Sequence, residues 1–364
     1  MRGSWWDGLL RALVAGLVVV AGLALPMVAP QSAQAVPPGT YAYVTNFNAN
    51  TVSVINTATN TVAVTVPVGA APWEVAVSPN GTRAYVTNRA DGTVSVINTA
   101  TDTVVATVPV GLEPLGAAVS PDGTRAYVTN FSGDTVSVIK TNTNTVVATV
   151  PVGDAPIGVA VSPNGTRAYV TNSDADTVSV IKTATNTVVA TIPVGAFPFG
   201  VAVSPNGTRA YVTNFNADTV SVIRTNTNTV VATVPVGDAP QGVAVSPNGT
   251  RAYVVNADAD TVSVIKTATN TVVATVPVGD APREVAVSPN GTRAYVTNAN
   301  ADTVSVINTA TNTVVATVPV GDLPFGVAIG VVPCPGHGKP GHGKSGHDRP
   351  TTATVPARGN CTPA

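Results

Sequence analysis

The 364-residue sequence has little charge, because charged residues make up only 10% of it and the formal net charge is −1. An ordinary soluble domain has about 25% charged residues. A chain without a strong positive field is not expected to concentrate nucleic acid at its surface. The composition therefore excludes a typical nucleic-acid-binding protein, and we expect no such partner.

Histidine and cysteine are scarce and confined to the end of the chain: His337, His342, His347, Cys334 and Cys361. Histidine is the usual general base near neutral pH, and no Ser/His/Asp or Cys/His set exists before residue 333. These absences argue against an enzyme, and the sequence gives no sign of a cofactor. The three histidines, five residues apart, are weak candidates for binding a transition metal.

Long apolar runs are missing except at the N-terminus. Arg2 and Arg11 precede the run "ALVAGLVVVAGLAL", and small residues follow at Ala33 and Ala35. This order is typical of a secretory signal peptide, so residues 1–35 are predicted to be cleaved. An uncleaved anchor is the alternative, because apolar residues continue to Ala29.

Export predicts a secreted or envelope-associated protein with no membrane span after cleavage. The compartment would be oxidising, and Cys334 and Cys361 would then close the tail on itself through a disulfide.

Repetition is what the chain has in abundance. The stretch "TRAYVTN" begins at Thr82 and recurs with small changes every 42 residues, with tyrosines at Tyr43, Tyr85, Tyr127, Tyr169, Tyr211, Tyr253 and Tyr295. Each unit holds four strand candidates, which in the unit from Pro156 are "IGVAVS", "TRAYVTN", "DTVSVI" and "TVVATIPV". The first two are joined by Ser-Pro-Asn-Gly, where Asn-Gly tolerates positive φ at both central positions of a hairpin turn. Four strands in 42 residues match a propeller blade.

The ends of the repeat region indicate a closed ring. The first copy lacks a first strand, and "PFGVAIGVV", from Pro324, adds a lone first strand after the last copy. Each fourth strand contains a proline, which cannot donate to a ladder and favours an edge. The sequence predicts an all-β, seven-bladed propeller over residues 36–332, closed by the C-terminal strand. A low-complexity Gly/His/Lys/Pro tail follows over residues 333–364.

The repeat resembles the YVTN-type, WD40-like propeller repeat of surface-layer-type and YncE-like proteins, over residues 37–332. This resemblance implies the fold but says little about function, because propellers carry many unrelated functions. The resemblance extends to seven-bladed lactonases and lyases, and it implies polar, often histidine-bearing channel mouths for those enzymes.

Two loop positions vary between copies and share one side of the disc, named here the upper face. The position after the second proline of each unit reads Trp73, Leu115, Ile157, Phe199, Gln241, Arg283 and Phe325. The loop after Tyr-Val-Thr-Asn begins with Phe47, Arg89, Phe131, Ser173, Phe215, Ala257 and Ala299. Aromatic residues exposed on loops of a rigid scaffold favour a recognition surface. The alternative is that they plug the channel mouth.

The main functional expectation is an exported, monomeric, non-catalytic binding or scaffolding protein. Its partner would be an extracellular protein, a glycan or an envelope component. One alternative is a lactonase-like hydrolase or lyase that uses Glu74 and Glu284, which occupy the same repeat position on either side of Gly326. These carboxylates could hold a hard cation, or pair with Arg89 and Arg283. A structural envelope protein is the other alternative.

Overall fold

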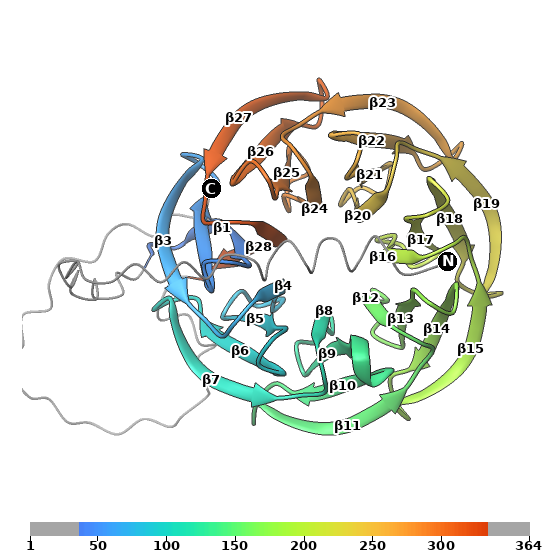
Figure 1. Ribbon diagram of the computed structural model, residues 1–364, viewed down its shortest axis with the longest axis horizontal. Helices are drawn as coiled ribbons and strands as arrows, with labels where there is room; N and C mark the ends of the chain where they lie inside the picture. The colour runs from blue at the N-terminus through green and yellow to red at the C-terminus, as the bar shows by residue number, and fades with distance from the viewer. Residues whose placement is uncertain (1–35, 334–364) are drawn as a thin grey trace, which may run out of the picture. The chain divides into compact units, whose positions relative to one another are not determined.

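The computed structural model describes residues 36–333, which form seven four-stranded antiparallel sheets arranged as a ring (Figure 1). The predicted signal peptide (residues 1–35), the tail beyond residue 333, both cysteines and the three histidines lie outside the described residues. Within 36–333 the one helical segment is the short η1, Phe131–Gly133, and no helix there could cross a membrane. The seven-bladed propeller is confirmed.

The two inner strands of each blade are the first and second of the repeat. The first strands surround the central axis: β4 Pro72–Val77, β8 Pro114–Val119, β12 Pro156–Val161, β16 Pro198–Val203, β20 Pro240–Val245, β24 Pro282–Val287 and β28 Pro324–Val332. The second strands are β1 Gly39–Asn46, β5 Arg83–Asn88, β9 Arg125–Asn130, β13 Arg167–Asn172, β17 Arg209–Asn214, β21 Arg251–Asn256 and β25 Arg293–Asn298.

The outer half of each blade holds the third and fourth strands. The third strands are β2 Thr51–Asn56, β6 Thr93–Asn98, β10 Thr135–Lys140, β14 Thr177–Lys182, β18 Thr219–Arg224, β22 Thr261–Lys266 and β26 Thr303–Asn308. The fourth strands form the rim: β3 Thr61–Pro67, β7 Thr103–Pro109, β11 Thr145–Pro151, β15 Thr187–Pro193, β19 Thr229–Pro235, β23 Thr271–Pro277 and β27 Thr313–Pro319. Each ends in its proline at the open edge of the sheet, as expected.

The ring closes within one blade, whose strand order is β28-β1-β2-β3. β28 pairs antiparallel with β1 from Gly39↔Val332 to Asn46↔Pro324, so the two ends of the repeat region share a sheet. Closure covers the inner edge of β1, so the ring keeps only the short edges that every blade has. The closure predicted from the incomplete first copy is confirmed.

The hydrophobic core lies between blades rather than at the axis. Seven clusters of buried residues each combine side chains of two neighbouring blades; in one of them Tyr43 and Val54 pack on Val86 and Ile97. The second and third strands are buried along most of their length, whereas each fourth strand alternates between inward and solvent-facing residues. Every repeat therefore needs a neighbour to bury its sheet.

Two side chains of the Tyr-Val-Thr-Asn motif, those of threonine and asparagine, form hydrogen bonds between elements. In six blades the threonine hydroxyl donates to the first strand of the next blade, as Thr87 does to the Leu115 carbonyl at 2.7 Å. The asparagine amide bonds the third strand of its own blade, and in five blades its oxygen accepts from a loop glycine, as Asn130 does from Gly111 at 3.0 Å. The repeated motif is thus explained by inter-element hydrogen bonds.

The Ser-Pro-Asn-Gly connection forms the predicted hairpin with a different turn. Gly81 has φ of +68°, whereas Asn80 has no positive φ. Gly81 N donates to the Ser78 carbonyl, which places Pro79 and Asn80 at the central positions, and Asn80 Oδ1 accepts from Ser78 Oγ and Thr82 N. Proline favours the first central position of such a turn. The expectation of positive φ at both Asn and Gly was wrong for this reason.

Candidate functional site

The seven variable residues after the second proline meet at the upper mouth of the channel. Each is the second residue of an inner strand, so the ring of blades directs all of them to the axis. Six of them line one pocket: Trp73, Ile157, Phe199, Gln241, Arg283 and Phe325. Leu115 is buried beside it at 1% exposure. The structure therefore brings together what the repeat comparison had singled out.

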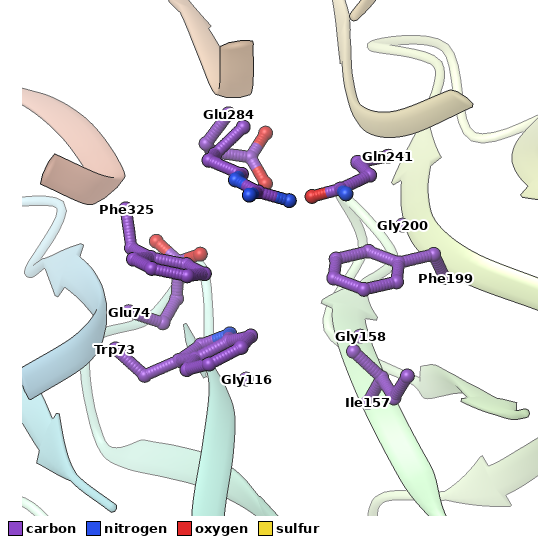
Figure 2. A pocket seen from close by; sticks show the side chains of 12 residues that line it. Trp73, Glu74, Gly116, Ile157, Gly158, Phe199, Gly200, Gln241, Glu284 and Phe325 are labelled. Atoms are coloured by element: carbon purple, nitrogen blue, oxygen red, sulfur yellow. The ribbon is translucent and has the colours of Figure 1, made fainter. Parts of the chain in front are cut away.

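The aromatic residues at this mouth are buried, which corrects the expectation of exposed recognition residues. Trp73, Phe199 and Phe325 are only 7%, 8% and 9% exposed. Figure 2 shows Trp73 and Phe325 side by side, with Phe199 facing them across the pocket. They plug the channel because seven inner strands converge there and bulky side chains fill the taper.

A three-ring cluster closes one side of the mouth. The ring centroids of Trp73 and Phe325 are 4.2 Å apart, and Phe47 lies 5.9 Å from Trp73 and 5.4 Å from Phe325. The guanidinium groups of Arg89 and Arg283 lie 5.7 Å from the Trp73 ring and 5.3 Å from the Phe325 ring, within the range of cation–π attraction.

The other phenylalanines of the upper face take different places. Phe215 packs between Phe197 and Phe199, with centroid distances of 5.8 and 6.4 Å. Phe131 belongs to η1 and is half-buried, outside the residues that line the pocket. The structure therefore packs Phe47 and Phe215 against rings that line the pocket.

Directly below the variable ring lies a second ring of two glutamates and five glycines. Glu74 and Glu284 occupy this position in two blades, and the other five blades hold Gly116, Gly158, Gly200, Gly242 and Gly326. All of them except Gly242 line the pocket. The glycines beside the glutamates leave room for the carboxyl groups, because a Cβ at Gly242 would lie 2.4 Å from Glu284 Oε1 and one at Gly326 would lie 2.8 Å from Glu74 Oε1. Each glutamate thus depends on a glycine of the preceding blade.

The two carboxyl groups are held in an environment that favours the neutral form. Burial raises the pKa of Glu284 to about 7, against a small lowering by its hydrogen bond from Val285 N at 3.0 Å. Burial and the nearby charge of Glu284 raise the pKa of Glu74 well above its usual range, although Val75 N donates to it at 2.9 Å. Surrounding protein removes water while each side chain keeps some surface on the channel. Two acids that cannot both ionise easily are a common feature of catalytic sites.

The arginines near the mouth do not neutralise these acids. Arg89 forms an ion pair with Glu113 at 2.8 Å, so the alternative in which it pairs with a pocket glutamate was wrong. Within residues 36–333 no ion pair joins Arg283 to Glu284, and burial lowers the pKa of Arg283, against the opposing effects of Asp258 and Asp280. Arg283 is thus a partly desolvated cation that lines the pocket beside two carboxyl groups.

A metal ion fits this site poorly. A hard cation takes six or more oxygen ligands, and the mouth offers the carboxyl groups of Glu74 and Glu284 with the Gln241 amide. Residues 36–333 contain no group of three or more His, Cys, Asp or Glu side chains that could hold a metal. The arrangement suits proton transfer better than coordination.

The two faces of the disc differ strongly in charge. Of the 17 acidic residues between 36 and 333, 15 belong to upper-face loops or strand ends, beside only two of the 12 basic residues, a net of −13. The lower face carries the other two acids and ten cations, a net of +8. Five upper-face aspartates accept a hydrogen bond from a neighbouring loop, as Asp134 does from Ala155 N. The field at the mouth is therefore negative.

Comparisons with known proteins agree with this architecture. The family model described as "Lactonase, 7-bladed beta-propeller" matches residues 32–193. No curated protein sequence matched the chain.

The similar solved structures show the same fold. One is hydrazine synthase of Kuenenia stuttgartiensis, with 24% identity, a TM-score of 0.70, and coverage of 80% of this chain and 99% of the other. Another is a functionally unknown protein from Desulfotomaculum acetoxidans DSM 771, with 20% identity, a TM-score of 0.73 and the same coverage. A third is dihydro-heme d1 dehydrogenase NirN in complex with DHE, with 17% identity, a TM-score of 0.61, and coverage of 84% and 77%.

The family match contradicts our main functional expectation of a non-catalytic binding or scaffolding protein, because the matching family is described as lactonases. The argument from missing histidine gave too little weight to Glu74 and Glu284. Their signal was present in the sequence as Glu in two copies of one repeat position that otherwise holds Gly. The seven-bladed propeller is supported, whereas the narrower YVTN and YncE-like assignment is not confirmed.

Proposed function

We propose that the protein is a hydrolase that opens a small, uncharged lactone at the channel mouth, with Glu284 and Glu74 as its acid–base pair. The observation that carries the proposal is the pair of buried carboxyl groups with raised pKa in one pocket. The description of the matching family as lactonases supports the reaction class.

The proposed reaction needs one carboxylate and one carboxylic acid. With a pKa of about 7, Glu284 is partly ionised at neutral pH and can take a proton from the attacking water, whereas Glu74 stays protonated. Water oxygen bonds the carbonyl carbon, and the ring C–O bond then breaks. Glu74 donates its proton to the leaving ring oxygen. The proton on Glu284 returns to Glu74 through cavity water, so the enzyme is unchanged and the product is a hydroxy acid.

The developing oxyanion needs a donor that is fixed before the reaction. Arg283 and Gln241 both line the pocket, and Figure 2 shows the Gln241 amide directed into it. A partly desolvated guanidinium stabilises negative charge more than one in water does, since the local dielectric is lower. In the proposal Arg283 holds the oxyanion and Gln241 orients the substrate.

The aromatic residues would act as a gate in this proposal. The enclosed volume is about 40 Å³, enough for about three water molecules. A lactone ring needs more space, so Trp73 or Phe325 must swing outward to admit it. The apolar rim favours an uncharged substrate, and the net negative charge of the upper face would repel the anionic product and promote its release.

The proposal also places the reaction outside the cytoplasm. The signal-like N-terminus supports secretion or envelope association, so the substrate would be an extracellular lactone.

The test is hydrolysis of a panel of neutral γ- and δ-lactones by the protein expressed from the full-length gene. The acid released is measured by pH-stat titration. Wild type is expected to turn over at least one of them. Glu284→Gln and Glu74→Gln should each lower kcat/KM at least 100-fold, since general acid–base catalysis contributes about 10²–10⁴-fold. Glu113→Gln, which removes an upper-face carboxylate outside the pocket, is the matched control and should retain activity. Activity that survives both pocket substitutions would refute the proposal, as would no activity on any lactone.

A further inference from the structure

Asp102 departs from the repeat at a buried place that the proposed function does not use. The equivalent positions of the other six blades hold asparagine: Asn60, Asn144, Asn186, Asn228, Asn270 and Asn312. All seven residues have φ between 50° and 55°, so they meet the same backbone requirement. Because asparagine tolerates this left-handed conformation at least as well, the backbone does not explain the aspartate.

The carboxyl group of Asp102 lies against the first described residue of the chain. Its Oδ2 accepts a hydrogen bond from Val36 N at 3.1 Å, and Asp102 is 2% exposed. Its Oδ1 is buried with no hydrogen-bond partner among the described residues, as is also the case for four of the equivalent asparagines. Val36 is 8% exposed and packs in one cluster with Tyr41, Tyr43 and Val332 of the closing blade.

The arginine that can reach this position from the preceding blade is absent where the aspartate stands. Between two other neighbouring blades, Arg167 donates to the side chain of Asn228 at 3.5 Å. In the closing blade the arginine position is Tyr41, whose hydroxyl donates to the Pro37 carbonyl at 2.8 Å. The one aspartate in the series therefore faces the one blade that has no arginine to offer it.

We propose that the chain is cleaved between Ala35 and Val36 and that the new α-ammonium of Val36 forms a buried ion pair with Asp102, which locks the closing blade. The inference is independent of the proposed catalytic function. A signal peptidase would add one water across the Ala35–Val36 peptide bond. The carboxyl group stays with Ala35, and the Val36 nitrogen becomes an amine that takes up a proton at neutral pH. Ala33 and Ala35 are the small residues that such a peptidase requires.

The burial of Val36 sets the order of events. A peptidase cannot reach a bond at a nitrogen that is hydrogen-bonded inside the closed ring, so cleavage has to precede the pairing of β1 with β28. The ammonium then brings three donors where the amide had one, and these can reach both Oδ2 and Oδ1. A buried carboxylate is costly when unpaired and is stabilised by an adjacent opposite charge.

The raised pKa of Asp102 indicates a carboxyl group that has no cation beside it while Val36 N is an amide. Burial raises the pKa of Asp102 to about 6, against the lowering effect of the hydrogen bond from the Val36 amide. An ammonium at the same nitrogen would lower that pKa. The other titratable groups that sense Asp102 are Tyr41 and Tyr43 of β1, whose pKa values are raised by burial and then by the Asp102 charge. Both stay neutral below pH 10, so neither titrates with the proposed pair.

The first test uses the full-length gene expressed with export in a bacterial host. N-terminal sequencing of the product is expected to begin at Val36. In the folded protein an amine-acylating reagent at pH 7 should modify the Val36 amine at least tenfold more slowly than in denaturant. A different N-terminus, or equal acylation in both states, would overturn the proposal.

Two variants separate the ion pair from simple burial. Insertion of Gly-Ser between Ala35 and Val36 keeps the cleavage site but moves the ammonium away from Asp102, and Asp102→Asn restores the residue of the other blades. Both should acylate quickly. An acylation rate unchanged by Asp102→Asn would refute the ion pair. If either variant fails to fold, sequencing and acylation of wild type still decide.

The pH dependence of unfolding supplies a second readout. An Asp102 pKa depressed by the ammonium contributes stability above its unfolded value of about 3.9, and that contribution is lost as pH falls through the folded pKa. The ammonium pKa is raised, so its contribution is present below about 8 and is lost as pH rises through the folded value. Wild type should therefore exceed the insertion variant in stability most clearly between about pH 5 and 8. Parallel pH profiles for the two proteins would refute the ion pair.

Discussion

One blade lacks the threonine that hydrogen-bonds the next blade, and restoring this hydrogen bond should stabilise the protein. Six blades use a threonine hydroxyl to bond the next blade, whereas β21 has Val255 at the same position. Val255 is fully buried, and β21 pairs with β20 in the same register as the other blades, from Val245↔Ala252 to Pro240↔Asn256. A threonine at 255 would thus place its hydroxyl between Gly242 N and the Arg283 carbonyl.

The expected magnitude follows from the neighbouring blade. Thr213 Oγ1 donates to the Gln241 carbonyl at 2.6 Å and accepts from Gly200 N at 2.8 Å. A hydrogen bond contributes about 0.5–1.5 kcal/mol net, and a buried group left without a partner costs about 1–3 kcal/mol. Val255→Thr should therefore raise the free energy of unfolding by about 1–2 kcal/mol. Thr213→Val, the matched reverse change, should lower it by about 2–4 kcal/mol.

Guanidinium unfolding followed by Trp73 fluorescence would measure both variants, because Trp73 is the one tryptophan between residues 36 and 333. The midpoint should move while the slope stays constant, which marks a change in stability rather than in the denatured state. A destabilised Val255→Thr variant would refute the reasoning. It would mean that this blade junction, which lies under Arg283 and Glu284, needs the valine.

Two further predictions concern the glutamate ring. A pKa raised in the folded state makes Glu284 contribute stability that is fully present below its unfolded pKa of about 4.5 and is lost as pH rises through about 7. Unfolding at pH 5 and pH 8 should therefore differ by about 2.5 kcal/mol from this group alone, and Glu284→Gln should reduce that difference; an unchanged difference would show that Glu284 is not the titrating group. Gly242→Ala should displace the Glu284 carboxyl, since the new Cβ would lie 2.4 Å from Oε1, and should cost about 1–3 kcal/mol of stability together with most lactonase activity. Gly39→Ala, whose Cβ would meet Tyr41 at an ordinary 3.4 Å, is the control, and equal effects of the two substitutions on activity would contradict the steric argument.

Much of the fold follows from the sequence because the same pattern of strand and turn residues recurs in seven copies. Alternating valines and threonines, a proline in each fourth strand and a split first blade are local or countable features, and they lead to seven blades and to the closure of β28 on β1. The 42-residue period leaves few topologies to choose from. Even so, the turn differed from the expected one. Pro79 takes the first central position, so Asn80 takes the second and Gly81 follows the turn with a positive φ.

The candidate site required the tertiary structure, since its properties come from convergence around the axis. Sequence comparison placed Trp73, Phe199 and Phe325 on one face but could not say that they are buried against each other. It placed Glu74 and Glu284 at one repeat position, yet the pKa of each is raised by burial between blades, and that of Glu74 also by the charge of Glu284. Likewise, Asp102 is one substitution among seven copies until the closed ring brings Val36 N to 3.1 Å from it. The sequence by itself determined the repeating strands and their packing partners, because those depend on neighbours along the chain. Only the ring decided which departures from the repeat meet, since residues up to about 280 positions apart become neighbours when the last blade closes.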